Sequence, residues 1–203
     1  MTETTTGTAA TATTAGTGTG TGTGTTSLTG NYNLDAAHTR IGFSARHAMV
    51  TKVRGAFNEF AGSGYFDQDN PANSHVELTI KAASIDTRNA DRDTHLRSND
   101  FLAMDEYPEI AFKSTAVDKA DQDHYNVSGD LTIKGVTKPV TVGFEFTGSA
   151  VDPWGNLRLG FEGSTAINRR DWGVNWNAAL EAGGVLISDK VTLEFEIAAV
   201  KAA

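Results

Sequence analysis

From Gly30 onwards, apolar and polar residues alternate along most of the chain, a pattern typical of β-strands that bury one face. Residues 76–82 show it most clearly, because Val76, Leu78 and Ile80 alternate there with polar or charged residues. Turns rich in Gly, Pro, Asn and Asp separate many of the alternating segments. The pattern predicts strands at residues 30–34, 38–47, 53–66, 76–82, 110–117, 125–133, 140–146, 157–167 and 191–197.

One stretch breaks this alternation and has the features of a short helix. Asn89 can cap the helix, and Asp91 and Asp93 favour its positive N-terminal end. Pro108 ends the helical part, so the insertion is predicted around residues 89–107. We expect it to cover the sheet as a lid or plug, with three apolar side chains packed inward: Leu96, Phe101 and Leu102.

About eight strands joined mostly by short turns predict an all-β antiparallel barrel or sandwich. A closed up-and-down barrel is favoured, because closure removes the unpaired edge strands through which sheets aggregate. Within the longest segment, residues 53–66, a bulge or a sharp bend is predicted at Gly55, Gly62 and Gly64.

The segment before the first strand has a different composition. Residues 2–27 are almost only Thr, Gly and Ala, with one charge at Glu3, so they cannot bury enough apolar surface to offset the entropy of ordering. We expect residues 1–27 to be a disordered tail and residues 28–203 to be the folded domain. The tail lacks the basic start and apolar core of a secretory signal, and no apolar run is long enough to span a membrane, so a cytoplasmic location without stable membrane insertion is expected.

Charge and composition narrow the function. The net charge of −8 is dispersed along the chain, which argues against nucleic acid and against an anionic membrane surface as partners. The absence of cysteine excludes disulfides, thiolate catalysis and cysteine-ligated metals. No P-loop, dinucleotide fingerprint or G-x-S-x-G motif is present, so no cofactor is expected.

Several short motifs follow one another along the domain. They are DAAHTRIGFSARH at 35–47, RGAF at 54–57, SIDT at 84–87, RDTHLRSNDF at 92–101, YPEIAF at 107–112, GDLTIKGVTKPV at 129–140 and INRRDWG at 167–173. Together they resemble the YceI-like family, and the resemblance covers nearly all of residues 28–200.

The resemblance implies an extended, lipocalin-like up-and-down barrel with a helical insertion, often dimeric. It also implies an elongated internal cavity that binds a polyisoprenoid, such as a prenyl quinone or a polyprenyl diphosphate. We therefore expect a homodimer that stores or transports an isoprenoid lipid without catalysis.

An isoprenoid tail has no hydrogen-bonding groups, so its site must be an apolar tunnel with few polar atoms. Small residues at the inward positions Ala45, Gly163 and Thr165 leave room for such a tunnel. The alternative is a filled core, as in a stress-related interaction protein that binds no ligand. The candidate tunnel residues are Ile41, Phe43, Phe57, Leu78, Ile80, Phe112, Leu131, Ile133, Phe144, Phe161 and Leu193.

Arg and His donors at the tunnel mouth would suit a diphosphate or a quinone carbonyl. His47 shares the inward parity of Phe43, whereas Arg46 has the outward parity. The alternative is a structural network in which Asp86 or Asp93 accepts hydrogen bonds from His or Arg. Four residues are the candidates for contact with a head group: His38, His47, Arg92 and His95.

An enzyme with a metal-assisted site at the barrel mouth is a second hypothesis. Asp93 and His95, with His38 or His47, offer oxygen and nitrogen ligands suited to zinc or non-haem iron. No compact H-x-x-x-H or H-x-x-E-H spacing supports that site. The binding protein is therefore the first hypothesis, with no metal and no catalytic residue assigned.

Two neighbouring arginines, Arg169 and Arg170, stand beside Trp172 in the irregular segment after the eighth predicted strand. Arginines next to an acidic residue in such a segment usually lie at the surface. We expect both to form a surface ion pair with Asp171 or with a neighbouring loop.

Overall fold

The alternating segments form eleven strands in the computed structural model, which describes residues 27–181 and 183–203. The predicted tail, residues 1–27, lies outside the described residues except for Ser27. The strands are β1 (Gly30–Leu34), β2 (Arg40–His47), β3 (Thr51–Phe57), β4 (Phe60–Phe66), β5 (His75–Lys81), β6 (Ile85–Asp86), β7 (Glu109–Lys119), β8 (His124–Ile133), β9 (Val136–Val151), β10 (Leu157–Asn168) and β11 (Ile187–Lys201).

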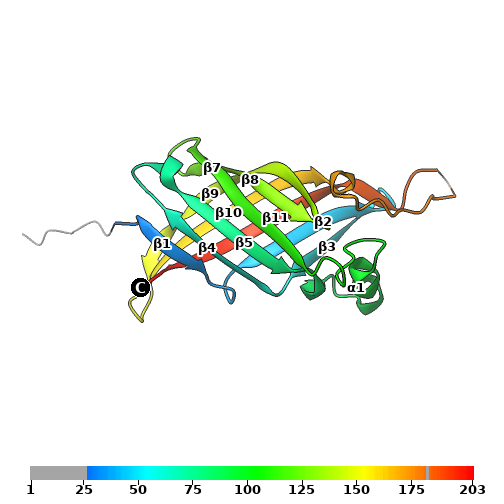
Figure 1. Cartoon of the computed structure of the whole chain (residues 1–203), viewed down its shortest axis with the longest axis horizontal. Coiled ribbons are helices and arrows are strands. Elements are labelled where there is room, and N and C mark those ends of the chain that lie inside the picture. The colour runs from blue at the N-terminus through cyan, green and yellow to red at the C-terminus, as the bar shows by residue number, and fades with distance from the viewer. Residues whose placement is uncertain (1–26, 182) are drawn as a thin grey trace, which may run out of the picture.

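Eight of these strands form a closed antiparallel barrel, the elongated body in Figure 1. Hydrogen-bonded neighbours run in the order β1-β4-β5-β7-β8-β9-β10-β11, and β1 closes the ring by pairing with β11. The hairpin of β2 and β3 continues the wall, because β2 pairs with the first part of β11 and β1 with its last part. The predicted closed up-and-down barrel is confirmed, and the sandwich alternative is excluded.

The predicted strand at residues 53–66 is two strands, β3 and β4, separated by Asn58 and Glu59. The Asn58 N–H donates to the Ser84 carbonyl at 3.2 Å, and the Glu59 carbonyl accepts from the Lys81 N–H at 2.9 Å. Both groups therefore bond to the segment that holds the short 3₁₀ helix η2 (Ala82–Ser84). The predicted bend position is wrong, because the strand ladder continues through all three glycines: Gly55, Gly62 and Gly64.

Strand β9 begins at Val136, earlier than the predicted residues 140–146. Pro139 lies inside it and pairs with Asp130 of β8. On its other side, β9 pairs with β10 only from Gly143 onwards, so the missing N–H of Pro139 interrupts no ladder there. The strand can therefore run through a proline.

The helical insertion contains one α-helix, α1 (Ala90–Arg97), which is shorter than the predicted residues 89–107. The Asn89 side chain accepts a hydrogen bond from the Arg92 N–H at 2.9 Å, as the sequence predicts for the cap. Ser98 then takes up extended backbone, and its hydroxyl donates to the His95 carbonyl at 2.8 Å, which ends the helix. Turns follow up to β7, and the whole insertion lies at one end of the barrel (Figure 1).

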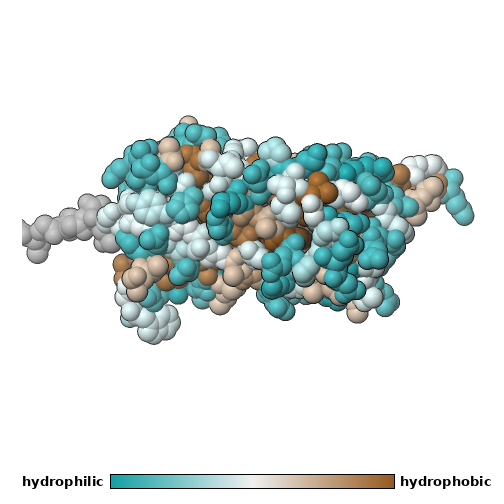
Figure 2. All heavy atoms as spheres, in the orientation of Figure 1, coloured by the Kyte–Doolittle hydropathy of each residue, from teal (hydrophilic) through white to brown (hydrophobic). Residues whose placement is uncertain are grey.

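Polar residues cover most of the molecular face in Figure 2, and apolar residues appear there in separated patches. The large apolar side chains that are exposed lie in or next to two turns: Met49, Val50, Val151 and Trp154. Within the described part of the chain, no helix has the length and apolar character needed to cross a membrane.

Candidate functional site

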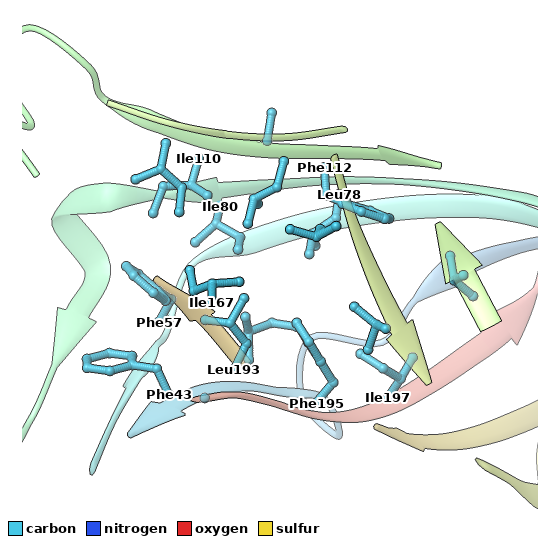
Figure 3. A pocket seen from close by; sticks show the side chains of 18 of the residues that line it. Phe43, Phe57, Leu78, Ile80, Ile110, Phe112, Ile167, Leu193, Phe195 and Ile197 are labelled. Atoms are coloured by element: carbon cyan, nitrogen blue, oxygen red, sulfur yellow. The ribbon is translucent and has the colours of Figure 1, made fainter. Parts of the chain in front are cut away.

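The barrel encloses a cavity of about 390 Å³ with an almost entirely apolar lining (Figure 3). Leu78 and Ile80 project from one wall, and Leu193 and Phe195 project from the opposite wall toward the same space. The volume lies within the range of small-molecule sites, about 300–1,000 Å³. The filled-core alternative does not describe this barrel.

Every candidate tunnel residue lies on the wall of this cavity. Alternation and antiparallel register bring them together; for example, Phe43 of β2 lies opposite Leu193 of β11, and Leu78 of β5 opposite Phe112 of β7. The residues are Ile41, Phe43, Phe57, Leu78, Ile80, Phe112, Leu131, Ile133, Phe144, Phe161 and Leu193.

The wall also contains residues that the sequence analysis did not assign to it. Ile110, Ile167 and Ile197 share the parity of assigned neighbours in their own strands, so a stricter use of the alternation would have found them. Trp172 and Val174 lie in or after the 3₁₀ helix η3 (Arg169–Trp172), where no alternation exists.

Three phenylalanine rings of the wall lie against glycines of a neighbouring strand. A Cβ atom at Gly55 would be 2.4 Å from Cζ of Phe43, and a Cβ atom at Gly129 would be 2.5 Å from Cζ of Phe112. A Cβ atom at Gly163 would be 2.5 Å from Cδ1 of Phe144. Because glycine has no side chain, each ring can lie along the wall. The room expected at Gly163 is therefore occupied by the Phe144 ring.

Aromatic side chains pack together at one end of the cavity. The ring centroids of Phe66 and Tyr125 are 5.8 Å apart, and those of Phe66 and Phe161 are also 5.8 Å apart. Phe146 lies 5.3 Å from Phe161, measured between centroids. Such spacing is that of favourable aromatic pairs, so these rings stabilise one another.

The polar side chains of the lining include a group near α1. Arg92 of α1 lines the cavity, and its Nε donates to Thr87 Oγ1 at 2.7 Å while its Nη2 donates to the Thr87 carbonyl at 2.9 Å. Asp93 is buried and accepts from the Thr87 N–H at 2.9 Å and from the Thr87 hydroxyl. His47 lines the same cavity from the end of β2 and is exposed.

The structural network is present, with different donors from those predicted. Asp93 accepts from Thr87 and not from a His or Arg side chain. Asp86 accepts from the backbone N–H of Arg88 at 2.7 Å and from the Asn58 amide at 3.4 Å. The network holds the start of α1 against the segment that carries Thr87.

Two of the four head-group candidates lie away from the cavity wall. His38 is exposed, and its Nδ1 lies 2.8 Å from an oxygen of Asp35. His95 Nε2 lies 2.8 Å from Asp100, and its ring packs edge-on against Trp176 at 4.7 Å between centroids. Both aspartates are close in the sequence, whereas Trp176 comes from a distant segment.

The metal-ligand set of the enzyme hypothesis is not brought together. Asp93 bonds to Thr87, whereas His95 and His38 each bond to a different aspartate. Among residues 27–181 and 183–203, no three His, Asp or Glu side chains converge as metal ligands.

Arg169 of η3 was expected at the surface, and this expectation is wrong. Its side chain is only 6% exposed and forms part of the cavity wall. Its Nε donates to the Ser188 carbonyl at 3.1 Å and its Nη1 donates to the Val174 carbonyl at 2.6 Å. Burial lowers the pKa of this guanidinium from its usual value. Arg170 does form an ion pair at the surface, but its partner is Asp189 of β11 and not Asp171 or a loop, since its Nε lies 2.7 Å from Asp189.

A closed antiparallel barrel around an apolar cavity defines a lipocalin-like class of β-barrel protein. Within that class, the chain belongs to the YceI-like family, since residues 32–199 match the YceI-like domain. A UPF0312 protein of Photorhabdus laumondii is 46% identical over 149 residues, covering 72% of this chain and 77% of the relative. Protein YceI of Escherichia coli O157:H7 is 40% identical over 151 residues, covering 73% and 78%.

Solved structures share the fold. BcnA of Burkholderia cenocepacia superposes with a TM-score of 0.72 at 25% identity, covering 81% of this chain and 98% of that chain. The YceI protein of Campylobacter jejuni gives 0.68 at 31% identity, covering 84% and 97%. A polyisoprenoid binding domain from Saccharophagus degradans, implicated in plant cell wall breakdown, gives 0.61 at 16% identity, covering 84% and 98%. At that identity, the last likeness concerns the fold alone.

Proposed function

We propose that this protein binds an isoprenoid lipid in the barrel cavity and stores or carries it without catalysing a reaction. The observation that supports this proposal is the almost entirely apolar cavity of about 390 Å³. A branched hydrocarbon chain has no hydrogen-bonding groups, so it gives up no hydrogen bond with water when it enters an apolar space. Burying it contributes about 25 cal/mol per Å² before the costs of binding are subtracted.

The comparisons support the same ligand class. A protein of this fold is described as a polyisoprenoid binding domain, and this chain has the same barrel with an internal cavity. The prenyl quinone or polyprenyl diphosphate ligand, the homodimer and the cytoplasmic location stay predictions.

The first test is native mass spectrometry of the purified full chain, followed by organic extraction and identification of the extracted lipid. We expect a bound prenyl compound, and the intact mass will report whether the chain is a dimer. A protein that carries no lipid and does not bind an added prenyl quinone or prenyl diphosphate would refute the proposal.

A variant pair tests whether the lipid occupies the cavity. Ala45 lines it from β2, so Ala45→Phe places a ring in the space and should weaken prenyl binding by about tenfold or more. Thr141→Phe adds the same ring at an exposed position of β9 outside the lining and should leave affinity unchanged. Equal affinity of both variants, measured by calorimetric titration, would locate the lipid outside the cavity.

A further inference from the structure

The charged residues among those that line the cavity are all of one sign. Arg46, Arg92 and Arg169 lie in the lining, whereas no Asp or Glu of the described residues does. The chain as a whole has 25 acidic and 17 basic residues and a net charge of −8. The lining is therefore positively charged although the molecule as a whole is negative, and a positive lining favours an anionic ligand.

Arg169 holds a hydrogen-bond donor for which the described residues supply no acceptor. Its Nη2 is buried and unpaired, although the other two guanidinium nitrogens donate to backbone carbonyls. The carboxylate of Asp189 lies 3.5 Å from Nη2 without a hydrogen bond, and it accepts from Arg170 Nε at 2.7 Å. One carboxylate thus forms ion pairs with two guanidinium groups, and Arg169 keeps a buried donor without an acceptor.

Arg46, His47 and Arg92 reach the lining at the same end of the barrel as Arg169. The Ser188 carbonyl accepts from Arg169, and the Ser188 hydroxyl accepts from the Arg46 N–H at 3.0 Å. The neighbouring Ile187 pairs with His47 across β11 and β2. Arg92 enters the lining from α1, the helix at that end of the barrel (Figure 1). An apolar chain in the cavity would therefore have its polar head among these groups.

We propose that the guanidinium of Arg169 binds an anionic oxygen, of a carboxylate or a phosphate, on the head of the apolar ligand. The cavity then selects an anionic amphiphile over a neutral amphiphile with the same hydrocarbon chain. A charge-assisted bond from a desolvated guanidinium supplies that selection, while Arg92 adds positive charge at the rim. This inference rests on the proposed function, because it assumes that the hydrocarbon chain occupies the cavity.

The test uses three probes with one twenty-carbon prenyl chain: geranylgeraniol, the corresponding carboxylic acid and geranylgeranyl diphosphate. Affinities are measured by calorimetric titration of the delipidated full chain, below the concentration at which the probes self-associate. We expect at least one anionic probe to bind about 10- to 100-fold more tightly than the alcohol, and the stronger of the two identifies the head group.

Variants then assign the selection to Arg169. Arg169→Gln should reduce the ratio of anion to alcohol affinity to about threefold or less, with alcohol affinity preserved. Arg54→Gln removes the same charge from an exposed position of β3 outside the lining and should keep the wild-type ratio. Asp189→Asn removes the carboxylate that competes for Arg169 and should raise the ratio about two- to fivefold. The Asp189→Asn variant therefore tests the role of Arg169 even if Arg169→Gln does not fold.

The outcomes separate this inference from the proposed function. Equal wild-type affinity for all three probes overturns anion selection and leaves lipid binding intact. Failure to bind any of them overturns the proposed function. Equal loss of alcohol and anion binding in Arg169→Gln, an unchanged ratio in that variant, or an unchanged ratio in Asp189→Asn overturns the role of Arg169.

Discussion

At the scale of single residues, glycines control how much of the barrel interior stays open. A phenylalanine ring that points toward the barrel axis would fill the space that a ligand needs. At Gly55, Gly129 and Gly163 the ring of a neighbouring phenylalanine occupies the place of the missing side chain. The wall is thus apolar and aromatic while the axis remains free.

Gly129→Ala tests this arrangement. Its Cβ atom would be 2.5 Å from Cζ of Phe112 and 2.5 Å from the Lys113 carbonyl oxygen, so the ring must move. We expect a loss of about 1–3 kcal/mol in the free energy of unfolding and weaker ligand binding. Gly143→Ala is the matched control, because its nearest neighbour is Asn126 Oδ1 at 3.8 Å. Equal effects of the two substitutions in urea unfolding would contradict the packing account.

Asp35 predicts a pH dependence of stability. Hydrogen bonds from Arg158 and then from His38 lower the pKa of its carboxyl to about 2. The carboxylate therefore stabilises the fold fully above its unfolded pKa of about 3.9, and this stabilisation is lost as the pH falls toward 2. In urea unfolding, the difference between wild type and Asp35→Asn should be largest near neutral pH and should shrink toward pH 2. A difference that stays constant between pH 6 and pH 2 would argue against this linkage.

At the scale of elements, α1 is a short helix that tertiary contacts and capping hold in place. An eight-residue helix is only marginally stable by itself, because its few hydrogen bonds do not offset the free-energy cost of nucleation. Asn89 caps its start, and the buried Asp93 bonds to Thr87. The same helix carries Arg92 to the cavity rim, so its position affects the site.

Removing the cap should loosen this element. Asn89→Ala leaves the Arg92 N–H without its acceptor and should cost about 1 kcal/mol. Faster amide hydrogen exchange in residues 90–97 would report it. Thr94→Ala, which loses only a hydroxyl bond to the Ala90 carbonyl and gains helix propensity, should be close to neutral. If Thr94→Ala loosens the helix as much as Asn89→Ala does, the cap is not what holds α1.

At the scale of the whole molecule, the barrel combines an aromatic cluster near one end with an open interior. Closure through β1 and β11 leaves the ring without an edge, so the fold does not depend on a completely packed core. The cost is an interior whose apolar side chains lack partners across the cavity. A bound hydrocarbon chain would supply those contacts.

Ligand occupancy should therefore raise stability. At a free prenyl concentration one hundred times Kd, the delipidated protein should gain about 2.7 kcal/mol, or roughly 5–10 °C in Tm. Differential scanning calorimetry measures this shift. Ala45→Phe should show a smaller shift at the same ligand concentration, and an equal shift would contradict binding in the cavity.

Much of the fold and the apolar part of the site could be predicted from the sequence. Alternation is a local property with a period of two residues, so Leu78, Ile80 and Leu193 could be assigned to one face before any strand partner was known. The cap at Asn89 is equally local. The end of α1 was predicted less well, because Ser98 and its hydrogen bond stop the helix before Pro108.

The sequence by itself determined an all-β chain with one helical insertion and the apolar face of each strand, because both depend on neighbours along the chain. Only the tertiary structure decided that the interior is hollow, since ring orientation at Phe43 and Phe144 depends on glycines in adjacent strands. It alone buried Arg169 in the cavity wall and left His38 and His95 outside it. The burial of Arg169 and its contacts with Ser188 and Asp189 depend on segments that meet only when the barrel closes, and the alternation within one strand does not specify such contacts.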